Sequence, residues 1–292
     1  MTRHALPRLA ALTAAMLVPA VAPTVASAAG TAQMVSGGTL QFTAAVGDTN
    51  TLKVTLATPN IVLEDTTASL NAGSGCTQVT AQKVNCPSNL TTGVTIATSD
   101  KNDSIESTVP RDVSIAAGSG DDTLKASGTG SKFFGGGSGY DFVSFSSSTV
   151  PVYGSINGSY DDGPFESSGW DYISSDIEMI GGGSAGDVLI GSDTQRTVLT
   201  GLGGANDLTA GSAGADLQGG SGSETLNGAA GNDAIVGGGG TDKFDGKGGN
   251  DTIYAKDGVG SEKITCGSGT DTVSADTTDI IVDPANCETI TY

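Results

Sequence analysis

Acidic residues recur at nine-residue intervals in the C-terminal half of this chain. From position 201 to 254 the sequence divides without a gap into six units of nine residues, and the sixth position of each of the last four is acidic: Glu224, Asp233, Asp242 and Asp251. Ca²⁺ takes roughly six to eight oxygen ligands, and glycine-rich turns free carbonyl groups to join carboxylates around it. A hard, oxygen-ligated cation is therefore open as a ligand of these residues.

The same six units predict the element that positions these carboxylates. The eighth position is apolar every time: Leu208, Leu217, Leu226, Ile235, Phe244 and Ile253. Glycine is at the first and fourth positions in five of the six units, which excludes a helix and permits tight turns. Each unit is thus expected to form a six-residue turn and a three-residue strand with one side chain in a narrow core. Stacked units form a parallel solenoid.

Four of the units carry a family resemblance. Those at 219–227, 228–236, 237–245 and 246–254 follow the pattern G-G-x-G-x-D-x-U-x, which resembles the nonapeptide of repeat-in-toxin (RTX), or hemolysin-type, calcium-binding proteins. The departures are Glu224 in place of Asp, Ala229 and Lys247.

The resemblance implies an all-β fold, a right-handed parallel β-roll or β-solenoid of nonapeptide repeats with N- and C-terminal caps. Each coil would contain two nonapeptides, so turns on one side would be about 18 residues apart. Ca²⁺ would lie between adjacent turns of one side, bound by sixth-position carboxylates and backbone carbonyls. This pairs Glu224 with Asp242 and Asp233 with Asp251. The alternative is a glycine-rich solenoid whose aspartates only cap turns.

Weaker copies extend the candidate metal ligands in both directions. After position 254 the phase slips by two residues, and the restored pattern places further acids at the sixth position: Glu262 and Asp271. Upstream copies at 117–125, 136–144 and 182–190 contribute three more: Asp122, Asp141 and Asp187. Two repeat units break the series, because Asn206 offers only a neutral oxygen and Ala215 offers none.

The overall charge excludes several classes of function. The 292 residues contain 32 acidic and 13 basic residues, a net charge of −19, so a nucleic-acid partner would be repelled. The single histidine is His4, within a predicted leader. The chain without that leader therefore has no Ser-His-Asp triad and no His-ligated zinc or copper.

The first 28 residues resemble a secretory signal. Arg3 and Arg8 precede an apolar stretch from 9 to 21, and Ala26-Ser27-Ala28 is a small-residue cleavage site. A buried N-terminal helix is the alternative. We expect a secreted, extracellular protein that begins near Ala29, with no later segment apolar enough to span a membrane.

Four cysteines remain in the expected mature chain. An exported chain with four cysteines suggests two disulfides, and three connectivities are possible. We favour the local pairs Cys76–Cys86 and Cys266–Cys287, because each lies near one end of the chain. Free buried thiols are the alternative.

The pattern divides the chain into six expected parts. They are a signal peptide (1–28), an N-terminal β cap region (29–90), early solenoid turns (91–145), an inserted loop and strand region (146–180), calcium-binding roll repeats (181–274) and a C-terminal cap (275–292). The inserted region contains the only tryptophan, Trp170, with Tyr160, Phe165 and Tyr172 among several acids. It is either a lateral loop that covers the roll or a sugar-binding groove.

Three functions are compatible with these features. The first is a secreted, non-enzymatic protein in which Ca²⁺ binding is coupled to folding. The second is a calcium-dependent polysaccharide-acting enzyme or carbohydrate-binding protein on a β-solenoid, which would need exposed carboxylates about 5–10 Å apart beside Trp170. The third, a use of the first, is a surface adhesin or matrix protein in which the roll is a spacer. Calcium ions are the expected partner, and an extracellular polysaccharide or surface partner is open.

Overall fold

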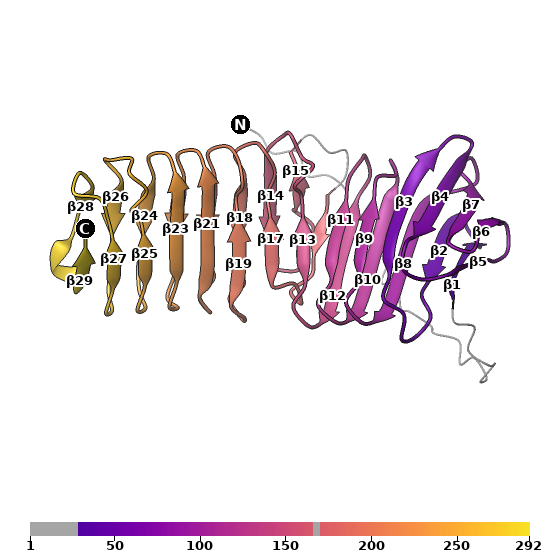
Figure 1. The fold of residues 1–292 in the computed structure, drawn as a ribbon, viewed down its shortest axis with the longest axis horizontal. Coiled ribbons are helices and arrows are strands. Elements are labelled where there is room, and N and C mark those ends of the chain that lie inside the picture. Colours follow the sequence, from indigo (N-terminus) through magenta and orange to yellow (C-terminus); the bar gives the residue numbers. More distant parts are fainter. Residues whose placement is uncertain (1–28, 166–169) are drawn as a thin grey trace, which may run out of the picture.

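The computed structural model describes residues 29–165 and 170–292. Over this range the chain is built of β-strands, and the one helical element is the short 3₁₀ turn η1 (Pro284–Asn286). Figure 1 shows the strands stacked along one long axis, with β1 to β7 at one end and the C-terminus at the other. The prediction of an all-β fold with a parallel solenoid, here of about ten coils, is confirmed.

One 14-stranded sheet, called the long sheet below, runs the whole length of the molecule. In spatial order it comprises β29 (Thr289–Thr291), β27 (Thr272–Ser274), β25 (Thr252–Tyr254), β23 (Ala234–Gly239), β21 (Ala215–Ser221), β19 (Thr197–Thr200), β17 (Met179–Gly181), β13 (Phe142–Ser144), β11 (Thr123–Ala126), β9 (Ser104–Ser107), β3 (Thr51–Ala57), β4 (Asn60–Asp65), β7 (Lys83–Pro87) and β6 (Thr77–Thr80).

Two shorter sheets complete the solenoid. A seven-stranded sheet comprises β16 (Tyr172–Ile173), β12 (Lys132–Ser138), β10 (Asp112–Ser119), β8 (Gly93–Asp100), β2 (Thr39–Thr43), β1 (Gly30–Val35) and β5 (Leu70–Ala72). An eight-stranded sheet comprises β15 (Gly163–Pro164), β14 (Val152–Ser155), β18 (Val188–Ile190), β20 (Asp207–Thr209), β22 (Thr225–Asn227), β24 (Lys243–Asp245), β26 (Lys263–Thr265) and β28 (Ile280–Ile281).

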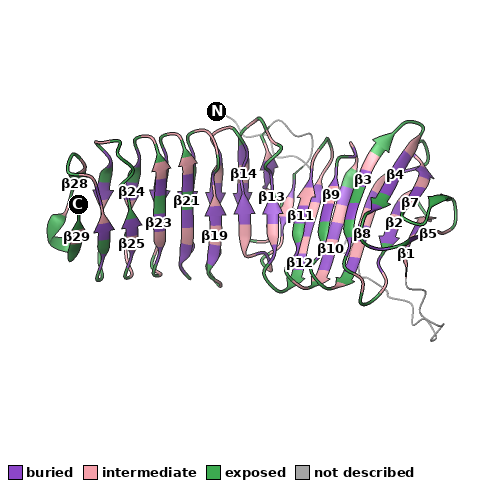
Figure 2. Ribbon diagram, viewed as in Figure 1, coloured by how far each residue is buried: buried purple, intermediate pink, exposed green. Residues whose placement is uncertain are grey.

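The core is a row of single apolar side chains that the register aligns from coil to coil. In the long sheet, Leu217 pairs with Ile235 and Ile235 with Ile253. In the eight-stranded sheet, Leu226 pairs with Phe244. All five side chains are fully buried, and Figure 2 shows buried and more accessible segments along the strands of the roll. The eighth-position residues therefore form the narrow core that the repeat predicts.

The slip of phase after position 254 does not interrupt the stack. Phe244 pairs with Ile264, and Ile253 pairs with Val273, so both faces absorb the same two-residue insertion. The extra residues lie in the exposed turn that precedes Glu262. The strands keep their register because the insertion is confined to a turn.

Antiparallel strands cover the N-terminal end. The pairs β1–β2, β3–β4, β4–β7 and β6–β7 are all antiparallel, whereas the strands from β8 onward pair in parallel, apart from the antiparallel pair β14–β15. The structure contains the disulfide Cys76–Cys86 in this region and Cys266–Cys287 near the C-terminus, the two local pairs favoured from the sequence. Both ends are thus held covalently.

The predicted signal peptide lies outside the described residues. Across the part of the chain that the structure covers, no helix has the length and apolarity needed to cross a bilayer.

The thin core makes single apolar residues important. Phe244 is fully buried, so Phe244→Ala removes a ring from a layer with few other contacts and should cost about 3–5 kcal/mol of unfolding free energy. Val236→Ala, at a 38% exposed position on β23, should cost less than about 1 kcal/mol. Urea unfolding of both variants at fixed calcium concentration tests this. Equal losses would contradict the core assignment.

Candidate metal centre

Acidic residues stand in register immediately before the strands and form two rows along the solenoid. The long-sheet ladder consists of the residues that precede β9, β11, β13, β17, β23, β25, β27 and β29, namely Asp103, Asp122, Asp141, Glu178, Asp233, Asp251, Asp271 and Glu288. The short-sheet ladder consists of the residues that precede β18, β20, β22, β24 and β26, namely Asp187, Asn206, Glu224, Asp242 and Glu262.

Most of these residues, called rungs below, are tied to the next rung of their ladder by a hydrogen bond from backbone to side chain. The amide of Asp233 donates to Oδ1 of Asp251 at 2.8 Å, and the amide of Asp251 donates to Oδ1 of Asp271 at 2.8 Å. In the short-sheet ladder the amide of Glu224 donates to Oδ1 of Asp242 at 2.9 Å. The two pairs expected from the repeat therefore lie on adjacent coils.

Many of the remaining carboxylate oxygens of the ladders are buried and have no hydrogen-bond partner. These are Oδ2 of five aspartates and both Oε atoms of two glutamates: Asp103, Asp122, Asp141, Asp251, Asp271, Glu224 and Glu262. Buried polar atoms are normally paired, so a row of unpartnered anionic oxygens is costly by itself. A hard cation is the group that this donor set fits.

The turns stack backbone carbonyls closely, and some of them lie near the ladder: a Cβ at Gly228 would overlap both the carbonyl oxygen of Gly246 and Oδ2 of Asp233. Gly240 has φ +132°, and a Cβ at this position would overlap the carbonyl oxygen of Gly222 one coil earlier. Gly238, with φ +103°, lies against the carbonyl of Gly220 in the same way. Within residues 29–165 and 170–292, no three carboxylates bring oxygens within 4.8 Å of one another. A bound cation would therefore need these carbonyls as well as the ladder.

Burial and mutual repulsion raise the pKa values of the ladder carboxyls. Burial, with a smaller contribution from neighbouring carboxylates, raises the pKa of Asp141 and of Asp251 to about 7. Burial and the adjacent Asp242 raise the pKa of Glu224 to about 7 as well. These groups resist ionisation in the ion-free protein, which is the behaviour of anions that lack a counter-charge.

The comparison with known families matches one part of the two ladders to a known repeat. Residues 218–253 match the model of the RTX calcium-binding nonapeptide repeat, in four copies. Within residues 218–253 the chain carries RTX calcium-binding nonapeptide repeats. The matched segment spans the four units that carry the resemblance in the sequence. No curated protein matches the chain.

All nine predicted metal ligands lie in the two ladders that continue the RTX repeats. As ligands they remain predictions, since the structure gives their positions only. The sequence reasoning missed three rungs that lie outside glycine-rich motifs: Asp103, Glu178 and Glu288. Each stands two residues before an apolar residue of the long sheet, as in the repeats, so an acid–any–apolar pattern without the glycines would have found them.

The long-sheet ladder has a defined beginning. The amide of Asn50 donates to Oδ1 of Asp103 at 2.7 Å, and its side-chain amide donates to Oδ2 of Asp65. Oδ1 of Asp65 also accepts the amides of Thr51, Thr67 and Ala68. Burial raises the pKa of Asp65, but these hydrogen bonds outweigh it and lower the pKa overall. Both carboxylate oxygens of Asp65 accept hydrogen bonds from the protein, so this end of the ladder does not need a cation.

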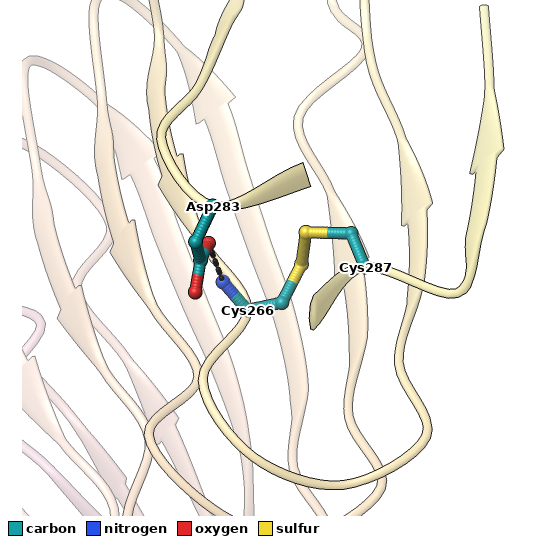
Figure 3. A group of neighbouring side chains, drawn as sticks. All are labelled: Cys266, Asp283 and Cys287. Carbon is teal, nitrogen blue, oxygen red and sulfur yellow. Dashed lines mark hydrogen bonds between the residues drawn. A yellow bond between two sulfur atoms is a disulfide. The ribbon is translucent and has the colours of Figure 1, made fainter. Parts of the chain in front are cut away.

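A cluster near the C-terminus superficially resembles a metal site. Cys266, Asp283 and Cys287 lie together, as Figure 3 shows, but the two sulfurs form a disulfide and offer no thiolate. Asp283 accepts the backbone amides of Cys266 and Gly267. The disulfide and the hydrogen bonds of Asp283 therefore stabilise the C-terminal end.

The inserted region holds its aromatic residues partly in solvent. Tyr160, Phe165 and Trp170 are about two-thirds exposed, whereas Tyr172 stacks on Phe133 with ring centroids 4.7 Å apart.

The acids that flank the exposed rings, Asp162 and Asp171, are buried and accept backbone amides. This pair therefore does not form the exposed groove that the enzymatic hypothesis requires.

Calcium-free protein should lose stability as pH rises. The folded protein retains protons on Glu224, Asp141 and Asp251 up to about pH 7, whereas the unfolded chain releases them near pH 4. The stabilisation from these groups is complete below about pH 4 and is lost as pH rises through 7. Urea unfolding in EDTA at pH 5 and 7.5 measures it, and Asp251→Asn should reduce the difference. Higher stability at pH 7.5 in EDTA would contradict this account.

Adjacent glycines in one turn should differ sharply. Gly240→Ala places a methyl group on the Gly222 carbonyl at positive φ and should cost at least about 1–3 kcal/mol of unfolding free energy. Gly239→Ala meets no atom within 4 Å and is the matched control. Thermal unfolding with excess calcium compares them, and similar melting temperatures would count against the close stacking of turns.

Proposed function

We propose that this protein is a secreted, non-enzymatic calcium-binding protein whose RTX coils fold as Ca²⁺ binds between stacked turns. The observation that supports this most strongly is the row of buried, unpartnered carboxylate oxygens in the two ladders. The sixth-position residues Glu224, Asp233, Asp242 and Asp251 supply acidic groups at the matched repeats, and the turn carbonyls supply the other oxygens.

The coupling to folding follows from charge. Without the predicted leader the chain has 32 acidic and 11 basic residues, and the ladders stack acids on successive coils. Divalent cations neutralise that repulsion, so binding free energy contributes to folding free energy. Extracellular calcium modules have dissociation constants of roughly 10⁻⁴–10⁻³ M. With such an affinity the chain would stay loose inside a cell and fold outside.

Two features support secretion and a non-catalytic role. The leader-like first 28 residues and two disulfides fit an oxidising, extracellular compartment. The ladder aspartates are held by backbone amides of the preceding coil, an arrangement that serves packing between coils rather than proton transfer to a substrate.

A calcium titration tests the proposal. Circular dichroism of the mature chain should show a β-rich signal that develops with calcium but not with equal magnesium, because Mg²⁺ demands a smaller octahedral site and retains its water. Calorimetry should detect calcium binding over the same range. An unchanged spectrum with no calcium heat would refute the proposal.

A single-atom substitution tests the ligand assignment. Asp242→Asn keeps the acceptor for the Glu224 amide but removes the charge, and should weaken calcium binding about tenfold at its site, or about 1.4 kcal/mol. Asp245→Asn, three residues later on β24, makes the same change at a less buried position and should leave affinity within about twofold. Calorimetry on both variants tests this, and equal effects would contradict it.

A further inference from the structure

The acidic ladders are interrupted in the middle of the molecule. In the long sheet, strand register places Thr197 and Ala215 where the flanking coils have Glu178 and Asp233. In the short-sheet ladder of the same region, the rung is Asn206. The coils between Asp187 and Glu224 therefore have no acidic rung on either edge.

On the long-sheet edge of this gap, a guanidinium group spans the coils. Arg196 Nη1 donates to the carbonyl oxygen of Asn232 at 2.6 Å, and Nη2 donates to the carbonyl of Ala215 at 3.1 Å. Nη2 also pairs with Asp216. Gly214 has φ +90° and passes beside Nη1, where a side chain would crowd the guanidinium. A fixed positive charge therefore contacts carbonyls of the two following coils.

On the opposite edge, a neutral amide takes a comparable place. Asn206 is 2% exposed, and its Oδ1 accepts the amide of Asp187 as an acidic rung would. Its Nδ2 donates to the carbonyls of Gly204 and Gly219 at 3.3 and 3.2 Å. The amide thus satisfies carbonyl oxygens that a carboxylate would leave for a cation.

A side chain of the seven-stranded sheet also donates to backbone carbonyls of stacked turns. Lys132 is 2% exposed, and its Nζ donates to the carbonyls of Arg111, Gly128, Thr129 and Gly130 at 2.6–3.3 Å. The backbone amide of Lys132 donates to Oδ1 of Asp171 on the next coil, as the amides of the ladders do.

Two surface lysines bind side-chain carboxylates instead. Lys53 and Lys83 pair with glutamates on the surface, where an ion pair contributes little. Arg196 is itself about half exposed and pairs with Asp216, but it also donates to backbone carbonyls of the two following coils, and a charged donor forms a stronger hydrogen bond than a neutral one.

We propose that Arg196 and Asn206 make the coils between Asp187 and Glu224 independent of calcium, with donors of the protein itself in place of the ion, and that Lys132 does the same at its own turn. Calcium-dependent order is then confined to the coils that carry acidic rungs. The confinement of calcium-dependent order rests on the proposed function, whereas the stability of the middle coils without calcium does not.

Hydrogen exchange in EDTA and in calcium separates the two parts. In EDTA, amides of residues 197–218 should remain protected while those of 225–274 exchange rapidly, and calcium should protect only the second group further. Equally rapid exchange in both segments in EDTA would overturn the proposal. If wild-type protein shows no calcium response while residues 197–218 stay protected, the proposed function fails and the inference about these coils stands.

Two variants test the donors directly. Arg196→Met should lower the melting temperature in EDTA by about 3 °C or more, with the number of bound calcium ions unchanged. Lys263→Met, an exposed residue on β26, is the control for loss of charge and should cause no comparable shift. An unchanged melting temperature for Arg196→Met in EDTA would overturn the role of the guanidinium.

Asn206→Asp converts the neutral rung to an acidic one. It should lower the melting temperature in EDTA, recover it in calcium and add one bound ion, as counted by calorimetry. Asn157→Asp, at an exposed turn, is the matched control and should do none of these. A loss of stability that calcium does not recover would contradict the assignment of Asn206.

Discussion

The fold depends on stacking an anion directly above an anion. In the ladders, each aspartate is fixed by an amide of the coil before it, so these acids cannot turn outward to water without loss of a backbone hydrogen bond. The geometry that makes the coils regular is therefore the same geometry that concentrates negative charge. Such a stack is stable only if protons, cations or donors of the protein offset the charge.

The narrow core explains why the negative charge of the ladders has to be offset. Each nonapeptide buries one large side chain, such as Ile235 or Phe244, between two sheets. One such side chain contributes roughly 1.5–3 kcal/mol of burial energy, which must also cover the entropy of ordering nine residues rich in glycine. Solenoid coils interact only with their neighbours, so a coil that is too unstable by itself has to be stabilised by groups within that coil or the adjacent coils. The antiparallel N-terminal strands and the two disulfides stabilise the ends but do not reach the middle coils.

Much of this could be predicted from the sequence, because the repeat encodes both the core and the turn. The apolar eighth position predicts the buried row from Leu208 to Ile253. The same nine-residue spacing locates the two-residue insertion that precedes Glu262. The rungs Asp103 and Glu178 were missed because their turns lack the glycine signature, although their spacing to Ile105 and Ile180 is identical. The roles of Arg196 and Lys132 depend on which carbonyls lie within reach across coils, a property of the fold that no local spacing contains.

The variation in coil length shows which constraint is rigid. Rungs joined by hydrogen bonds are 18 residues apart at Asp233 and Asp251, 19 at Asp122 and Asp141, and 20 at Asp251 and Asp271, yet the bonds remain 2.8–3.0 Å long. Insertions thus enter exposed turns, while the position of the acid relative to its strand is kept. The strand and its preceding rung form one unit, and the turn between units can vary. A coil that loses its acid can therefore keep its register, provided that another donor reaches the carbonyls the cation would have bound.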